Sequence, residues 1–452
     1  MRKLFGTDGI RGRVNTYPVI PEIAMQVGQA LVCQIRKSRK RCRIVIGRDT
    51  RLSCIMLEHA LAAGICSMGG EVLLAGTIPT PGIALMVKDL RADAGLVISA
   101  SHNPFQDNGI KIFAGDGFKL TDQAEIELEN LILSAGMDSL RPAAEEIGGS
   151  LSVEDAKERY IGFLKKTFSA SCSLNGCHMV LDCANGAGCG VAPQVFEELG
   201  AKVTAMGINP DGKNINQQCG ALYPKAMAAR VRELGADIGI ALDGDGDRLI
   251  VADERGEIVD GDQLMAICAK ELISKGRLKN QTLVATVMSN MGLEAAINQM
   301  GGKMVRTDVG DRYVIEYMRK NGCSFGGEQS GHLVFMDHIT TGDGILAALQ
   351  LLAVMQRQGK PLSELTGIME CFPQVLKNVK TSYRVEVSSI KGFSERVADF
   401  EQQLGRKGRI LVRASGTEPV IRVMAEGQDE KLITRMADEL CDMIADHNMR
   451  QL

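Results

Sequence analysis

The sequence predicts an α/β protein of several domains, and two observations support this prediction. Short apolar segments alternate with amphipathic ones over most of the chain, as expected where strands and helices alternate and the sheets are largely parallel. The chain also has 452 residues, about three times the length of an ordinary domain. Its 45% of hydrophobic and 24% of charged residues are typical of a soluble protein with sizeable cores.

The predicted elements form three similar groups, followed by a C-terminal segment of different character. The first group has strands at 43–47, 71–75 and 94–100, with helices near 22–37 and 54–69. The second has strands at 178–182, 202–206 and 237–242, and the third at 282–287 and 332–335. Strands at 409–413 and 420–425 and a helix over 429–446 then indicate a smaller α+β domain. We place the domains at 1–150, 151–255, 256–370 and 371–452.

Charge and cysteine usage exclude several classes of protein. A net charge of −3 argues against a general nucleic-acid binder, which needs clustered positive charge. We interpret the one basic run, at 36–43, as the solvated end of a helix. The 13 cysteines form no C-x-x-C pair, which favours reduced thiols. The N-terminus has no apolar signal segment, and no run of about 18 apolar residues occurs. We therefore expect a cytoplasmic protein without a membrane partner.

The most informative segment is DGDGDR at 243–248, directly after a predicted strand. Asp243, Asp245 and Asp247 alternate with glycines, so a tight loop can direct three carboxylates at one hard cation such as Mg²⁺. An EF-hand loop also begins with alternating acids, but it requires glycine at its sixth position, where this chain has Arg248. The segment 249–253 that follows also reads as a strand. These residues predict a magnesium site.

A second segment, ISASHNP at 98–104, places Ser101 at the end of a buried strand. The carboxyl ends of strands in α/β sheets are where ligands usually bind. Taken alone, an ordinary turn is the default interpretation, since Asn-Pro favours turns. A serine hydrolase is excluded because the G-x-S-x-G motif is absent.

Two further loops suit polar ligands, although each could by composition be an ordinary polar loop. GGEQSGH at 326–332 combines a carboxylate, an amide, a hydroxyl and an imidazole, which suits a polyhydroxylated ligand. RASGTEP at 413–419, with Arg422 nearby, offers guanidinium, hydroxyl and backbone N–H groups for a phosphate. The chain has no Walker A motif. GAGCG at 186–190 lacks the third glycine of a dinucleotide fingerprint, because residue 191 is Val191.

In this order, the loops ASHNP (100–104), DGDGDR (243–248), GEQSGH (327–332) and RASGTEP (413–419) resemble those of the α-D-phosphohexomutase superfamily over the whole chain. The resemblance implies a four-domain fold around a central cleft, with three α/β domains and a smaller C-terminal one. It implies a phosphoserine at Ser101 whose oxygen shares Mg²⁺ with the three aspartates. It also implies further roles for residues in the other loops. Catalytic groups would be His332 or Lys111 with Arg11, and the substrate would contact Arg248, Glu328, Ser330, Arg413, Ser415, Gly416, Thr417 and Arg422.

Within the superfamily, FGTDGIRG (5–12), NPFQDNGIKIF (103–113) and Gln329 are most similar to the bacterial members that act on glucosamine phosphates. This similarity implies interconversion of glucosamine 6-phosphate and glucosamine 1-phosphate through glucosamine 1,6-bisphosphate, for UDP-N-acetylglucosamine and cell-wall synthesis. Activity on mannose or glucose phosphates is the alternative, and a non-catalytic sugar-phosphate sensor is a third hypothesis. A homodimer is one assembly that the sequence leaves open.

Two segments depart from the pattern of the superfamily. The run NINQQCGALYP at 214–224 lacks the Ser-x-His element that relatives often carry there, so no contact is inferred from it. Asp308 stands where relatives often have a neutral or basic residue. Neither departure falls in the four main loops.

Overall fold

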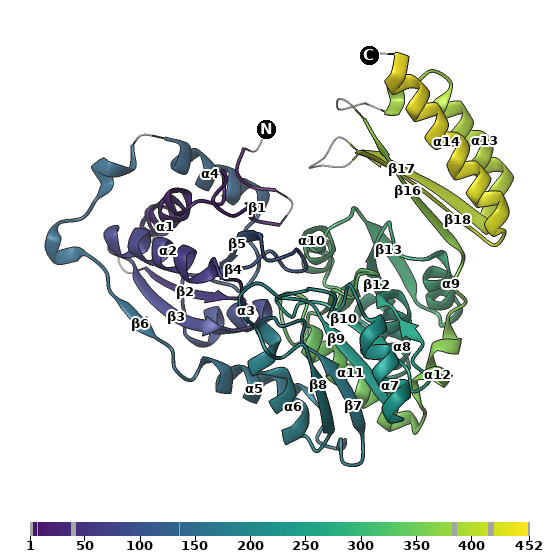
Figure 1. Cartoon of the computed structure of the whole chain (residues 1–452), viewed down its shortest axis with the longest axis horizontal. Helices are drawn as coiled ribbons and strands as arrows, with labels where there is room; N and C mark the ends of the chain where they lie inside the picture. The colour runs from purple at the N-terminus through teal and green to yellow at the C-terminus, as the bar shows by residue number, and fades with distance from the viewer. Residues whose placement is uncertain are drawn as a thin grey trace. The chain divides into compact units, whose positions relative to one another are not determined.

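The computed structural model describes residues 3–6, 8–37, 42–134, 136–381, 387–414 and 420–450. The chain divides into two compact units, Met1–Met288 with Met300–Ile368 and Ser289–Gln299 with Met369–Leu452. The described residues form three mixed sheets in the first unit and an antiparallel sheet in the second (Figure 1).

The first sheet has six strands in the order β1-β5-β4-β2-β3-β6. Its strands are β1 (Ile10–Arg13), β5 (Asp107–Ala114), β4 (Ala94–Ile98), β2 (Arg43–Arg48), β3 (Glu71–Thr77) and β6 (Ser150–Ser152). Helices α1 (Pro21–Arg36) and α2 (Cys54–Ser67) pack with Ile44 and Ile46, which lie on one face of β2. Helix α3 (Thr80–Asp89) places Ile83 against Gly47 and Gly95 on the other face. Helix α4 (Asp122–Leu133) adds Leu128 to the core beside α1.

The second and third sheets repeat the alternation of strands and helices. The second sheet has the strand order β11-β10-β9-β7-β8. Its strands are β11 (Ile258–Val259), β10 (Leu249–Ala252), β9 (Ile238–Leu242), β7 (His178–Asp182) and β8 (Lys202–Met206). Its helices are α5 (Ala156–Thr167), α6 (Ala192–Glu198) and α7 (Lys225–Leu234). The third sheet has the strand order β13-β12-β14-β15. Its strands are β13 (Lys303–Thr307), β12 (Thr282–Thr286), β14 (Phe325–Gly327) and β15 (Leu333–Phe335). Its helices are α8 (Gly261–Ser274), α10 (Asp311–Asn321), α11 (Gly344–Gln358) and α12 (Leu362–Leu365).

The three mixed sheets share one topological feature that positions the site. In each, a strand that pairs in parallel on one side is followed by a strand that pairs with it antiparallel: β4 by β5, β9 by β10 and β14 by β15. The loops at these reversals are the serine, aspartate and GEQSGH segments. Each therefore lies at the carboxyl end of a buried strand, where α/β folds bind ligands.

The second unit is a smaller α+β domain, as the sequence predicts. Strands β16 (Gln374–Lys380), β18 (Val420–Gly427) and β17 (Gly408–Ala414) pair antiparallel, with β18 in the middle. Helices α13 (Phe393–Leu404) and α14 (Glu430–Arg450) bury Phe393, Phe400 and Leu440 in its core. Helix α9 (Met291–Gln299) also belongs to this unit, and the Met291 N–H donates to Glu426 Oε1 at 2.7 Å.

The predicted α/β class is confirmed, and the predicted strands lie within two residues of those observed. The sequence analysis did not identify β6, β11, β13, β14 and β16 as strands. It also missed the antiparallel strands β1 and β5. They extend the first sheet beyond β4 and supply two residues of the site described below.

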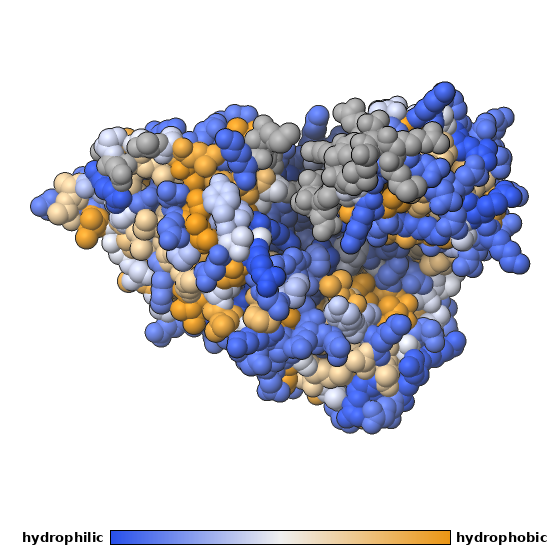
Figure 2. Space-filling model, turned by 45° about the horizontal axis from the view of Figure 1, so that its top comes forward, coloured by the Kyte–Doolittle hydropathy of each residue, from blue (hydrophilic) through white to orange (hydrophobic). Residues whose placement is uncertain are grey.

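None of the described helices combines the length and the hydropathy needed to cross a bilayer. On the face shown in Figure 2, hydrophobic side chains gather in separate patches between hydrophilic ones.

Candidate active site

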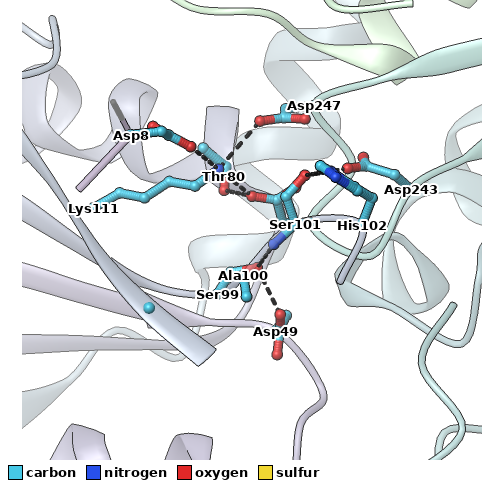
Figure 3. A network of polar contacts seen from close by, with 12 residues as sticks. Asp8, Asp49, Thr80, Ser99, Ala100, Ser101, His102, Lys111, Asp243 and Asp247 are labelled. Carbon is cyan, nitrogen blue, oxygen red and sulfur yellow. Dashed lines mark hydrogen bonds and ion pairs between the residues drawn. The ribbon is translucent and has the colours of Figure 1, made fainter. Parts of the chain in front are cut away.

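The serine loop after β4 and the aspartate loop after β9 meet directly. Ser101, only 1% exposed, donates a hydrogen bond from Oγ to Asp243 Oδ2 at 2.6 Å (Figure 3). Gly186 and Gly244 allow the loops to approach closely, because a Cβ on Gly244 would lie 2.6 Å from the Ser101 carbonyl oxygen and one on Gly186 2.3 Å from that of Gly244. Two residues 142 positions apart in the sequence therefore share one buried site.

Asp243, Asp245 and Asp247 form a buried cluster of carboxylates. Each offers an oxygen within 4.8 Å of the others, and none of the three is more than 3% exposed. Burial, together with the charges of Asp247 and Asp245, raises the pKa of Asp243 well above its usual value. The Oδ1 atoms of Asp245 and Asp247 have no hydrogen-bond partner among the described residues. Buried oxygens without partners suit a hard divalent cation, so the donor set fits Mg²⁺.

Lys111, on β5, supplies positive charge to this cluster. Its Nζ lies 2.7 Å from Asp245 Oδ2, 3.3 Å from Asp247 Oδ2 and 3.4 Å from Asp8 Oδ2. Burial alone would lower the pKa of Lys111, but the three carboxylates outweigh it and raise that pKa well above its usual value. Thr80, at the start of α3, donates to the same Asp245 oxygen at 2.5 Å.

His332 connects the third sheet to the cluster. The Gly342 N–H donates to its Nε2 at 3.1 Å, so a neutral ring carries its proton on Nδ1, 3.7 Å from Asp247 Oδ1. Burial lowers the pKa of His332, but Asp247 and Asp311 outweigh it and the pKa is raised. Conversely, Lys111 and His332 overcome the burial of Asp247 and hold its pKa well below the usual value.

Two arginines lie beside the serine and the aspartates. Arg11, on β1, donates from Nη1 to the Ala100 carbonyl oxygen at 3.4 Å and pairs with Asp8 through Nη2. The backbone N–H of Arg248 donates to Asp243 Oδ1 at 3.1 Å. Its buried Nε lies 4.0 Å from Asp247 Oδ1 and makes no hydrogen bond among the described residues. A buried guanidinium donor without a hydrogen bond suits an anionic ligand.

The GEQSGH loop presents one half-buried carboxylate and one exposed hydroxyl. Glu328 Oε1 accepts from the Gly310 N–H at 3.2 Å, and burial raises the pKa of this carboxyl group. Ser330 is exposed. Gln329 donates to Asp260 Oδ2 at 3.2 Å and so fixes the loop to the start of α8. The loop can therefore contact a polar ligand through Glu328 and Ser330.

The second unit carries the two predicted arginines of the phosphate loop. Arg413 on β17 and Arg422 on β18 lie directly opposite one another. Burial, with the charge of Arg422, lowers the pKa of Arg413. The buried Nε of Arg422 has no partner among the described residues. Because like charges in opposite positions repel, this pair suits an anion. The predicted contacts Ser415, Gly416 and Thr417 lie outside the described residues.

The sequence analysis missed five buried or half-buried residues that contact these loops or Lys111. They are Asp8, Asp49, Arg51, Thr80 and Asn216. Asp49 and Arg51 follow the predicted strand at 43–47, so they reach the same sheet edge as Ser101, and that position was an available signal. Asn216 contacts the serine loop only because two domains pack together, which no local pattern shows.

Comparison with protein families identifies the family of this chain. Models of the phosphoglucomutase/phosphomannomutase family match residues 2–137 (alpha/beta/alpha domain I), 158–256 (alpha/beta/alpha domain II), 260–372 (alpha/beta/alpha domain III) and 364–443 (C-terminal domain). The chain therefore belongs to the phosphoglucomutase/phosphomannomutase family, with its four-domain α/β architecture. The family and the aspartate cluster together define a metal-dependent isomerase that acts on phosphosugars.

Curated relatives of this chain carry a more specific name than the family does. A phosphoglucosamine mutase of Desulfotalea psychrophila is 65% identical over 98% of this chain and 99% of its own. That of Syntrophotalea carbinolica is 56% identical over 99% and 98%. That of Myxococcus xanthus is also 56% identical, over 98% and 97%.

Solved structures support the fold. A phosphoglucomutase/phosphomannomutase family protein from Burkholderia thailandensis matches with a TM-score of 0.82 at 23% identity, over 98% of this chain and 96% of that one. An N-acetylphosphoglucosamine mutase from Aspergillus fumigatus, solved with GlcNAc-6P and magnesium, matches with a TM-score of 0.68 at 17% identity, over 99% and 96%.

Proposed function

We propose that this protein interconverts glucosamine 6-phosphate and glucosamine 1-phosphate, on the route to UDP-N-acetylglucosamine. The observation that carries the proposal is the 2.6 Å hydrogen bond from Ser101 Oγ to Asp243, beside two carboxylate oxygens that accept no hydrogen bond from the described residues. It puts a hydroxyl that can carry a phosphate next to a place for a divalent cation. The curated relatives support glucosamine phosphates as the substrates, because they are phosphoglucosamine mutases at 55–65% identity over nearly the full chain.

The reaction would proceed in two transfers, since the two sugar oxygens lie too far apart for one direct step. Phosphoserine 101 gives its phosphate to the free hydroxyl of the substrate, which makes glucosamine 1,6-bisphosphate. This intermediate turns end for end, and Ser101 takes back the other phosphate. Each transfer breaks one P–O bond and forms another. The first leaves Ser101 without phosphate, and the second leaves the enzyme phosphorylated again.

Charge around Ser101 would supply most of the rate enhancement, as in other phosphoryl transfers. Asp243, Asp245 and Asp247 would hold Mg²⁺, which when bound neutralises charge on the transferred group. Lys111 and Arg11 would stabilise the same charge. The raised pKa of Lys111 keeps this side chain protonated, so His332 is the better candidate for moving the proton of the sugar hydroxyl.

The remaining loops would bind the parts of the substrate that do not react. Glu328 and Ser330 would contact sugar hydroxyls. Arg248 would contact a phosphate through its Nε–H, which makes no hydrogen bond among the described residues. Arg413 and Arg422, with Ser415, Gly416 and Thr417, would hold the distal phosphate. Binding energy from these remote groups would align the reacting atoms.

We also propose a cytoplasmic location, which suits a protein whose 13 cysteines are all free. Size-exclusion chromatography with light scattering would show whether it acts as a monomer or a homodimer.

The proposal is tested by kcat/KM on the 6-phosphates of glucosamine, glucose and mannose, with Ser101→Ala as a second arm. We expect the highest value for glucosamine 6-phosphate and, by intact mass, one phosphate on the wild type that the variant lacks. A hundredfold preference for glucose or mannose phosphate would overturn the substrate. Full activity of Ser101→Ala would overturn the phosphoserine.

A further inference from the structure

Three buried side chains outside the mechanism above converge on the backbone of the serine loop. We propose that Asp49, Arg51 and Asn216 are positioning residues that hold Ser101 in register with the aspartate loop while its side chain gains and loses phosphate. The inference rests on the proposed function, because it concerns the geometry of that phosphoryl transfer.

Arg51 binds three carbonyl oxygens of the serine loop. Its Nη2 donates to the carbonyl oxygens of Ser101 and Asn103 at 2.9 and 2.8 Å, and its Nη1 to that of Pro104 at 2.6 Å. Its Nε donates to Asp49 Oδ2 at 2.9 Å, and both side chains of this ion pair are 0% exposed. A planar guanidinium can make this set of directed bonds, which an ammonium group cannot reproduce.

Asp49 also helps to fix the backbone on the N-terminal side of Ser101. Its Oδ2 also accepts from Ser99 Oγ at 2.6 Å, and Ser99 Oγ accepts from the Ser101 N–H at 2.9 Å. Asp49 thus orients both Arg51 and Ser99 (Figure 3 shows Asp49, Ser99 and Ser101). The N–H and the C=O of Ser101 are therefore both bound to groups that Asp49 holds in place.

Asn216 makes the corresponding contact from the second domain. Its Nδ2 donates to the carbonyl oxygens of Ser101 and Asn103 at 2.9 and 3.0 Å, the same two atoms that Arg51 binds. A Cβ on Gly244 would lie 2.7 Å from this Nδ2, so Asn216 also packs against the aspartate loop. The residue therefore ties the position of Ser101 to that of the metal-binding acids.

These backbone contacts are needed because the hydroxyl of Ser101 does not fix its position throughout the reaction. Its hydrogen bond to Asp243 needs the hydroxyl proton, which phosphoserine lacks, so that bond is lost in half of the cycle. The backbone bonds do not depend on the state of the side chain. Ser101 also has φ +52°, a left-handed conformation that non-glycine residues keep only when their surroundings impose it.

The test compares Arg51→Lys and Asn216→Gly with matched controls. Lysine keeps the charge beside Asp49 but loses the directed bonds, and glycine tolerates the φ of +58° at position 216 while losing the amide. The controls are Arg43→Lys, in an exposed ion pair with Glu71, and Asn15→Gly, an exposed asparagine with φ +57°.

A displacement of about 1 Å can cost roughly 100-fold in rate. We therefore expect kcat to fall about 100-fold in Arg51→Lys and at least about 10-fold in Asn216→Gly, with KM for glucosamine 6-phosphate and the affinity for Mg²⁺ unchanged. The controls should match the wild type. Because both side chains bind the same two carbonyls, the effects of the double variant should not be additive.

Several results would overturn the inference: kcat within twofold of wild type in both variants, a loss confined to KM, or a loss that follows only the folded fraction measured by circular dichroism. If Arg51→Lys does not fold, Asn216→Gly decides alone. Failure of the proposed function is distinguishable, because a wild-type enzyme that is first dephosphorylated with a phosphatase and then takes no phosphate from glucosamine 1,6-bisphosphate refutes that function whatever the variants do.

Discussion

Replacing Lys111 by methionine should show how much the buried carboxylates destabilise the native state when they lose this positive charge. Lys111 is 1% exposed and its Nζ lies within 3.4 Å of three carboxylates. Methionine is of similar length but carries no charge, so Asp8, Asp245 and Asp247 would lose a common partner. Removing one member of a buried ion pair typically costs about 3–5 kcal/mol, and we expect a loss of this size in the free energy of unfolding without metal.

A divalent metal ion should then restore part of the stability that Lys111→Met has lost. Lys111 and a cation would both be attracted to the carboxylates of Asp245 and Asp247, so the removal of Lys111 should strengthen Mg²⁺ binding. At 100 times its Kd, a ligand stabilises the native state by about 2.7 kcal/mol. We therefore expect millimolar Mg²⁺ to stabilise Lys111→Met more than the wild type.

Urea denaturation with EDTA and with MgCl₂ measures both effects. Lys119→Met is the matched control, because Lys119 is also buried and pairs with Asp8 and Asp311, of which neither belongs to the metal cluster. Its loss of stability should not respond to Mg²⁺. The reasoning is refuted if Lys111→Met is as stable as the wild type in EDTA, or if Mg²⁺ stabilises the two variants equally.

Two further predictions concern the surroundings of the site. Asp343 caps α11 and accepts a hydrogen bond from the Tyr160 hydroxyl. Burial raises the pKa of this carboxyl group from 3.8 to about 6. The native state therefore binds this proton more tightly than the unfolded state, and the stability that this group contributes is lost as pH rises through 6. Between pH 4 and 7.5 the free energy of unfolding of the wild type, relative to Asp343→Asn, should therefore fall by up to about 3 kcal/mol, and parallel curves in urea titrations would contradict this. Gly186→Ala would place a Cβ 2.3 Å from the Gly244 carbonyl oxygen, so we expect its free energy of unfolding to fall by about 1–3 kcal/mol and its kcat to fall as well. The control is Gly162→Ala, whose Cβ would meet nothing within 4 Å and which should retain both stability and kcat. If Gly186→Ala were unaffected, the aspartate loop could move freely.

Much of the fold could be predicted because buried parallel strands are short apolar runs. Strand β7 was predicted with its observed bounds, and β9 within one residue. Strand β5 was missed because its sequence, DNGIKIFA, begins with turn-forming residues and contains Lys111, which is buried only because acids from other segments neutralise it. The boundaries between domains stay predictions.

The site was predictable where chemistry is concentrated in one loop. The aspartates could be identified because three carboxylates at alternate positions need a cation. Ser101 could not be distinguished from an ordinary turn by local pattern, and only the order of the four loops singled it out. Asn216 and Thr80 contact the loops through packing between domains, and asparagine or threonine in a loop has many ordinary uses.

The central claim is that Ser101 and the three aspartates share one divalent cation during phosphoryl transfer. The most direct measurement is an anomalous difference map from crystals of the phosphorylated enzyme grown with Mn²⁺ in place of Mg²⁺. We predict one peak about 2.0–2.3 Å from oxygens of Asp243, Asp245, Asp247 and the phosphate on Ser101. A metal bound elsewhere, or a phosphoserine that does not contact it, would contradict the account.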